Sequence, residues 1–269
     1  MKKPKKRNYL NNKDILSEIH KSKSTYCAFT LPDYHQYDSI LPSLERLNIR
    51  TIAEAKRNRA KRLSIEAETT IDYRKIKKTD VIFRIMTFDH IPNEPGRKKN
   101  PKTVADHKVK LPFPPFQHWK YDENDGLICV GKSHWDGDVD NGTFSLTHGF
   151  TTDTLATMWI KLCERYATKG NVRGYTYNDE MRGQAILQLA HIGLQFDESK
   201  SSNPFAYYTA AVTNSFVRII NMEKKNQSIR DDILEMNNMN PSYTRQAEGE
   251  WAMAQKREKE YQEQHSTDY

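Results

Sequence analysis

Apolar residues recur at helical spacing through the second half of the chain. Residues 152–167 and 178–196 each predict a helix, and residues 170–176 separate them. A third helix is expected after Asn203, a good N-cap, and Pro204, which suits the first helical position. The three predicted apolar stripes are Leu155, Met158, Trp159, Leu162, Cys163 and Tyr166; Met181, Ile186, Leu189 and Ile192; and Phe205, Tyr208, Val212, Phe216 and Ile219.

The first half has a different pattern. Residues 11–21 predict a short helix, and residues 51–70 predict a helix with a thin apolar stripe under a basic face. Residues 80–91 alternate and are rich in β-branched and aromatic side chains, which is typical of a strand. Residues 32–42 are bounded by prolines and predict a loop with a short turn.

These elements predict a mainly α protein with a β-containing or irregular insertion. Four parts are expected: a basic arm and N-terminal helix (1–50), the insertion (51–150), a helical domain (151–225) and a charged tail that is helical or partly disordered (226–269). The insertion comprises the basic helix and a small β-rich module at residues 71–145.

Composition narrows the class of protein. Of the 269 residues 36% are hydrophobic and 29% are charged, and no apolar run approaches the roughly 18–20 residues of a membrane span. The N-terminus lacks the apolar segment of a signal peptide. Three scattered cysteines without a CxxC pair favour a reducing cytoplasm over a disulfide framework or a zinc site.

Charge is unevenly distributed. Residues 1–110 contain 26 basic and 13 acidic residues, whereas the remaining residues contain 16 and 22. A basic first half indicates a polyanionic partner, most often nucleic acid, and a merely solvated surface is the alternative.

One segment matches a phosphate-loop pattern, GxxxxGK[ST], at Gly126–Ser133. Such a loop needs exposed backbone N–H groups that lead into a helix. Here the variable positions are Leu, Ile, Cys and Val, which favour a buried strand, and the following HWDGDVDNG cannot begin a helix. The pattern therefore does not predict a nucleotide site.

The neighbouring acids do not predict a metal site either. Asp136, Asp138 and Asp140 have calcium-loop spacing, but Asn141 replaces the glycine and Thr147 the bidentate glutamate. His118, His134 and His148 lack paired spacing. No catalytic residue, metal or cofactor is expected, although a metal- or nucleotide-dependent nucleic-acid enzyme centred on residues 71–150 stays as the alternative.

The third helix carries an unusual combination off its apolar stripe. Tyr207, Asn214 and Arg218 lie on the remaining face, with Tyr208 at its edge. Aromatic faces stack on unpaired bases, amides bond base edges and cations hold phosphates. This combination suits single-stranded DNA better than a duplex.

The same segment resembles region 2 of bacterial sigma factors. A helix ends in Phe196-Asp197, a short polar loop follows, and the next helix begins Phe205-Ala-Tyr-Tyr208. NYLNNKDIL near the start and DTLATMWIKLCERYATKGNVRGYT at residues 153–176 are similar to the late-transcription sigma factors of T-even-type tailed phages. The resemblance covers residues 8–20 and about 150–225, roughly a third of the chain.

The resemblance implies a non-enzymatic factor with a sigma region 2 helical bundle, acting in the host cell cytoplasm. Such factors bind the clamp coiled coil of core RNA polymerase and direct it to late promoters by melting an A/T-rich −10 element. It assigns polymerase binding to Glu180, Gln184 and Leu187. It assigns promoter binding to Phe205, Tyr207, Tyr208, Thr209, Asn214, Arg218, Lys224 and Lys225. Contacts to DNA phosphates are expected from Lys56, Arg57, Arg59, Lys61, Arg62, Arg97, Lys98 and Lys99.

The sequence also departs from this family. Ala211 and Val212 stand near the place of a tryptophan pair in housekeeping sigma factors, so melting should depend more on the two adjacent tyrosines. Only Tyr261 and Tyr269 remain of a hydrophobic-acidic terminal peptide, so binding of a sliding clamp is not predicted. Residues 28–145 are an insertion. The sequence leaves open a phage co-activator as a partner and a DNA-binding structural phage protein as a further alternative.

Overall fold

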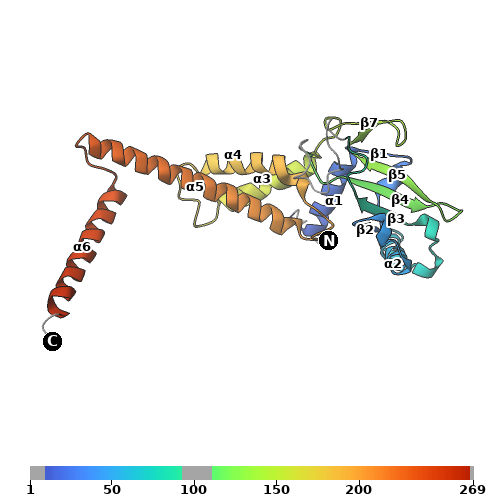
Figure 1. Cartoon of the computed structure of the whole chain (residues 1–269), viewed down its shortest axis with the longest axis horizontal. Helices are drawn as coiled ribbons and strands as arrows, with labels where there is room; N and C mark the ends of the chain where they lie inside the picture. Colours follow the sequence, from blue (N-terminus) through green and yellow to red (C-terminus); the bar gives the residue numbers. More distant parts are fainter. Residues whose placement is uncertain (1–9, 93–110, 267–269) are drawn as a thin grey trace, which may run out of the picture. The chain divides into compact units, whose positions relative to one another are not determined.

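The computed structural model describes residues 10–92 and 111–266 (Figure 1). The predicted basic arm at residues 1–7 and Arg97, Lys98 and Lys99 lie outside the described residues. The α-helices are α1 (Asn12–Ser24), α2 (Ile49–Glu66), α3 (Asp153–Ala167), α4 (Asn178–Ile192), α5 (Pro204–Met236) and α6 (Tyr243–Ser266). Short 3-10 turns include η1 (Pro32–His35), η2 (Leu44–Arg46), η3 (Tyr73–Lys75), η4 (Lys78–Asp80) and η6 (Gly193–Gln195).

A mixed sheet has the strand order β1-β5-β4-β3-β2. Its strands are β1 (Cys27–Phe29), β5 (Leu127–Ser133), β4 (Phe116–Tyr121), β3 (Ile82–Met86) and β2 (Ser39–Leu41). Only β2 and β3 pair in parallel, and the other neighbours are antiparallel. A separate ribbon pairs β6 (Trp135–Asp136) with β7 (Thr143–Phe144).

The sheet corrects the prediction of a mainly α protein, because the fold is mixed α/β. The β-containing module is confirmed, but two of its strands come from residues 27–41, which the sequence placed in the arm and a proline-bounded loop. Both strands are three residues long, so neither shows the alternation that identifies a strand.

The helix α2 covers one face of the sheet (Figure 1). Asn48 begins it with a capping box, accepting the N–H of Thr51 at 3.0 Å. Ala55 and Ala60 are buried in one cluster with Phe83 of β3. Small side chains on the helix let it approach the aromatic rings of the strands closely.

The helix α3 packs against both α1 and α4. All six residues of the predicted α3 stripe are buried. On α4 the buried positions are Met181, Ala185 and Leu189, a slightly different face from the predicted one. Gly193, directly after α4, lies against the Trp159 ring, and an added Cβ would overlap an atom of this ring. Close packing against this ring therefore requires glycine.

The chain divides into two compact units, with the boundary between Val212 and Thr213, inside α5. The second unit holds the remainder of α5 and α6, which confirms a helical segment in the C-terminal part. The turn between these helices depends on buried Asp231, which accepts hydrogen bonds from the backbone N–H and hydroxyl of Ser242 at 2.8 and 2.7 Å. Among the described residues no helix is long and apolar enough to cross a membrane.

Candidate functional site

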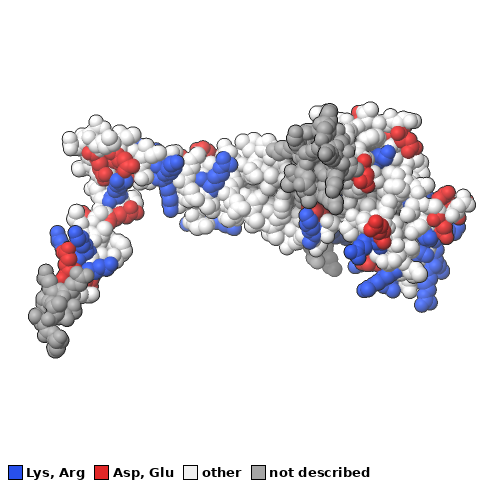
Figure 2. Space-filling view, viewed as in Figure 1, with Lys and Arg blue, Asp and Glu red and all other residues white. Residues whose placement is uncertain are grey.

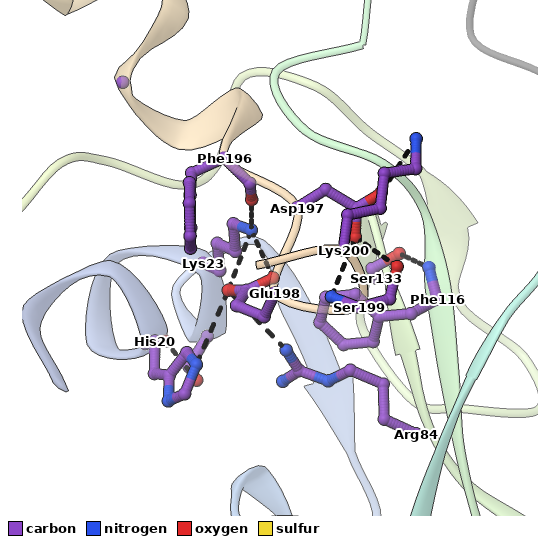
Figure 3. A network of polar contacts seen from close by, with 12 residues as sticks. His20, Lys23, Arg84, Phe116, Ser133, Phe196, Asp197, Glu198, Ser199 and Lys200 are labelled. Carbon is purple, nitrogen blue, oxygen red and sulfur yellow. Dashed lines mark hydrogen bonds and ion pairs between the residues drawn. The ribbon is translucent and has the colours of Figure 1, made fainter. Parts of the chain in front are cut away.

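A cluster of charged side chains lies buried where α1, the sheet and the loop after η6 meet (Figure 3). Lys23 of α1 donates to both carboxylate oxygens of Glu198, at 2.9 and 2.8 Å, and to the carbonyl of Phe196 at 2.6 Å. Arg84 of β3 places Nη1 4.0 Å from the same carboxylate. These three side chains are only 2%, 1% and 7% exposed for Lys23, Arg84 and Glu198.

The carboxylate stays ionised in this cluster. Burial alone would raise the pKa of Glu198, but Lys23 and Arg84 outweigh it and lower the pKa to about 2. His20 lies 3.5 Å from the carboxylate, and burial, followed by the charge of Arg84, lowers its pKa to about 4. His20 is therefore neutral near pH 7, and two cations share one carboxylate.

Aromatic rings hold the Arg84 guanidinium. It lies 3.9 Å from the Tyr37 ring centroid and 3.8 Å from that of Phe116. Its Nε donates to His118 Nε2 at 3.0 Å, while Nδ1 of this imidazole lies 2.7 Å from the Tyr34 carbonyl. Burial, followed by the charge of Arg84, lowers the pKa of His118 well below its usual value, so the neutral ring can accept from the guanidinium.

The cluster fixes the loop that leads into α5. Asp197 folds this loop by accepting the backbone N–H of Ser199 at 3.0 Å. Asn203 then caps α5 through the N–H of Ala206, and Asn12 of α1 accepts the N–H of Phe205, both at 3.0 Å. The buried contacts of Lys23 with Glu198 and with the Phe196 carbonyl therefore tie the loop before α5 to α1.

The three residues predicted to bind polymerase lie on one exposed face of α4. Glu180, Gln184 and Leu187 follow at i, i+4 and i+7, and all three are exposed. Leu187 is 55% exposed, so its side chain is accessible to a partner. The structure brings these residues together as the sequence predicted.

The residues predicted to bind the promoter are divided between core and surface. The prediction that Tyr208 stacks on a base is wrong, because Tyr208 is 1% exposed and its hydroxyl donates to the Gly193 carbonyl at 2.8 Å. Tyr207 is half-buried, with its hydroxyl donated to the carbonyl of Ile192 at 3.1 Å. Phe205 is 37% exposed, and Thr209 is half-buried with its hydroxyl on the Phe205 carbonyl. In the second unit Asn214, Arg218, Lys224 and Lys225 are exposed.

The basic residues of α2 are also divided. Arg59 and Arg62 approach the fully buried carboxylate of Asp38 to 3.4 and 2.9 Å, so they tie α2 to the sheet. Asp38 also accepts the Ile82 N–H at 2.9 Å. Contact of these two arginines with DNA phosphates stays a prediction, and such a contact would compete with their ion pairs to Asp38. Lys56 is half-buried, whereas Arg57 and Lys61 are exposed.

The segment proposed for an enzyme has the geometry of a sheet. Leu127–Ser133 forms β5 and leads into β6, not into a helix. The Ser133 hydroxyl is buried and accepts the Phe116 N–H at 2.9 Å, with His134 Nδ1 at 3.2 Å. Within residues 10–92 and 111–266, no three His, Cys, Asp or Glu side chains converge to hold a metal ion.

Reasoning from the sequence missed the buried cluster, although signals for it exist. Lys23 continues the apolar face of α1, because Ile15, Ile19 and Lys23 are spaced i, i+4 and i+8. Arg84 interrupts an apolar strand. A charge at a position that the pattern assigns to the core predicts a buried partner, but nothing along the chain identifies that partner as Glu198.

The chain matches no family model, and no curated protein or solved structure matches it. An assignment of function therefore depends on the residues themselves and on where the structure places them.

Proposed function

We propose that this protein is a late-transcription sigma factor of the type found in T-even-type tailed phages. It binds host core RNA polymerase in the host cytoplasm and directs it to late promoters by recognising and melting an A/T-rich −10 element. In this proposal α3, α4, the loop after η6 and the start of α5 are the counterpart of sigma region 2. The sheet and α2 belong to the insertion.

The observation that carries the proposal is the exposed face of α4. Leu187 projects from a helix whose opposite side is buried through Met181 and Leu189. The carboxylate of Glu180 and the amide of Gln184 flank it on the exposed side. An apolar centre with a carboxylate beside it suits an arginine-rich helical partner, because guanidinium groups bind carboxylates in a bidentate manner. The clamp coiled coil of polymerase has this chemistry.

Melting then depends on α5 residues that remain accessible. In the first unit Phe205 is the most exposed aromatic ring of the helix start, and Tyr207 is half-exposed. In the second unit, Asn214 and Arg218 offer an amide and a cation. Phe205 replaces Tyr208 as the residue that stacks on a flipped base.

Co-purification with bacterial core polymerase tests the docking step. Glu180→Lys combined with Gln184→Ala should abolish co-purification and leave the circular dichroism spectrum unchanged. The matched control is Glu123→Lys with Asn124→Ala, which makes the same charge reversal and also removes a side-chain amide, in the exposed turn between β4 and β5. Retention of polymerase by the α4 variant, or its loss from the control, would contradict the assignment of this face.

Transcription by the reconstituted holoenzyme tests the melting step. Phe205→Ala should reduce activity on a duplex promoter by roughly ten- to hundred-fold, because one base–aromatic stack is worth about 1–3 kcal/mol. Activity should recover on a template that is already unpaired across the −10 element. Equal activity of the variant and the wild type on the duplex would show that Phe205 captures no base.

A further inference from the structure

Several cations of the sheet region already form ion pairs or ring contacts within the protein. Arg59 and Arg62 bind Asp38, and Lys78 lies 2.8 Å from Asp125 and 3.6 Å from the Tyr121 ring centroid. These side chains stabilise the fold and cannot turn to a ligand without breaking a contact. A second group of exposed cations forms no salt bridge with a described carboxylate.

The second group surrounds Tyr73 of η3. The guanidinium carbons of Arg57 and Arg74 lie 5.3 and 5.9 Å from the centroid of its ring. Lys61 follows Arg57 by one helical turn, and Lys75 follows Arg74 in η3. We call Arg57, Lys61, Arg74 and Lys75 the Tyr73 patch.

The cations of the Tyr73 patch are accessible, and the charge of Asp72 acts on Arg74. All four cations are exposed, and none forms an ion pair with a described acidic residue. The nearby carboxylate of Asp72 accepts the backbone N–H of Arg74 at 3.0 Å and so caps η3. Lys and Arg side chains gather over α2 and the segment after it in Figure 2.

The ring of Tyr73 gives this patch a fixed geometry. Tyr73 packs partly buried against the core under α2, so its ring is anchored from below. Two guanidinium groups held around one anchored ring lose less conformational freedom on binding than free side chains do. The planar groups present donors that match phosphate oxygens.

We infer that the Tyr73 patch binds the phosphate backbone of duplex DNA without reading its sequence. The four cations lie on an open surface and offer donors but no base-reading amide, which suits backbone contact and not base recognition. This inference extends the proposed function, since it adds a DNA contact outside α5. It depends only on the protein and DNA, so it can be tested without polymerase.

The test is the salt dependence of binding to a fluorescent duplex of arbitrary sequence, measured by anisotropy. The variant combines Arg57→Gln, Lys61→Gln, Arg74→Gln and Lys75→Gln, which remove charge but keep long side chains. Each lost phosphate contact should reduce the slope of log K against log salt by about 0.9. The slope should therefore fall by about 2–4, and affinity at low salt should fall at least about ten-fold.

Two controls separate this contact from general charge and from folding. Lys169→Gln, Lys256→Gln, Arg257→Gln and Lys259→Gln remove the same charge from exposed positions elsewhere, in the turn after α3 and in α6, and should leave the slope unchanged. Arg62→Gln should lower the melting temperature but not the slope, since its guanidinium is held by Asp38.

An unchanged slope in the patch variant would overturn the inference, as would an equal loss in the charge-matched control. Tighter binding to a single-stranded RNA of equal length than to the duplex would also overturn it and indicate an RNA-binding surface instead. Co-purification of the patch variant with core polymerase should be unaffected. Failure of this inference is therefore distinguishable from failure of the proposed function.

Discussion

Replacing Glu198 by glutamine should destabilise the first unit more than any other single change in the buried charge cluster. The substitution keeps the shape of the side chain but removes the one carboxylate that two buried cations share. Lys23 and Arg84 then remain desolvated without a counter-charge. Breaking a buried ion pair by removing one partner typically costs about 3–5 kcal/mol.

The lowered pKa of Glu198 indicates a cost of the same order. The fall from 4.5 to about 2 corresponds to roughly 3 kcal/mol, at about 1.36 kcal/mol per pKa unit. Because the folded pKa lies below the unfolded one, this stability is present above pH 4.5 and is lost as the pH falls toward 2. A domain is typically stable by about 5–15 kcal/mol, so the loss is a large fraction.

Urea unfolding followed by near-ultraviolet circular dichroism measures the effect, with Lys23→Met as the matched control. The control breaks the same hydrogen bonds to Glu198 but leaves one cation and one carboxylate, so it should cost less, about 1–3 kcal/mol. The double variant should cost less than the two single variants combined, because the residues interact directly.

Two results would refute this reasoning. One is a Glu198→Gln variant within about 1 kcal/mol of the wild type at pH 7, which would mean that solvent reaches the cluster. The other is an equal loss of stability in both proteins between pH 4.5 and 2, since the variant lacks the group that titrates there.

Three further predictions, the first with a matched control substitution, test packing and buried hydrogen bonds in the first unit. Gly193→Ala should lower the free energy of unfolding by about 1–3 kcal/mol because the added Cβ meets a buried indole. The control, Gly183→Ala at an open position of α4, should raise the free energy of unfolding by about 0.5–1 kcal/mol. Thermal melts of both variants check this, and equal shifts of the melting temperature would contradict it. Tyr208→Phe should cost about 1 kcal/mol by removing a buried hydrogen bond, and a melting temperature equal to the wild type would place the hydroxyl in solvent. Burial lowers the pKa of His118 in the folded protein, so below about pH 6.5 only the unfolded chain takes up a proton at this residue and stability falls. His118→Gln should therefore flatten the loss of stability below about pH 6.5. An unchanged pH profile would show that His118 does not contribute to this loss.

The sequence alone determined the helices that bury a continuous stripe. The stripe of α3 is buried at every predicted position, and from Tyr208 to Ile219 the stripe of α5 is buried as well. Periodicity succeeds here because a helix of four turns repeats the pattern enough times to specify one face. On α4 periodicity succeeded only in part, because Ala185 is buried in place of the predicted Ile186 and Ile192, and the grouping of Glu180, Gln184 and Leu187 came from the resemblance to sigma region 2.

Tertiary structure decided what each polar or aromatic residue contacts. The pattern placed Tyr208 on the apolar stripe but also at the edge of the face predicted to bind DNA, and only the packed structure shows that its ring is buried. Nor could it show that Arg59 and Arg62 face Asp38, while Arg57, two positions before Arg59, faces solvent.

The buried charge cluster shows the limit most clearly. Lys23 and Glu198 are 175 residues apart, and Arg84 comes from a strand between them. Periodicity encodes which side of an element is buried, but contacts between distant elements depend on how the sheet and the helices pack. The partner of a buried charge is therefore fixed only when the chain has folded.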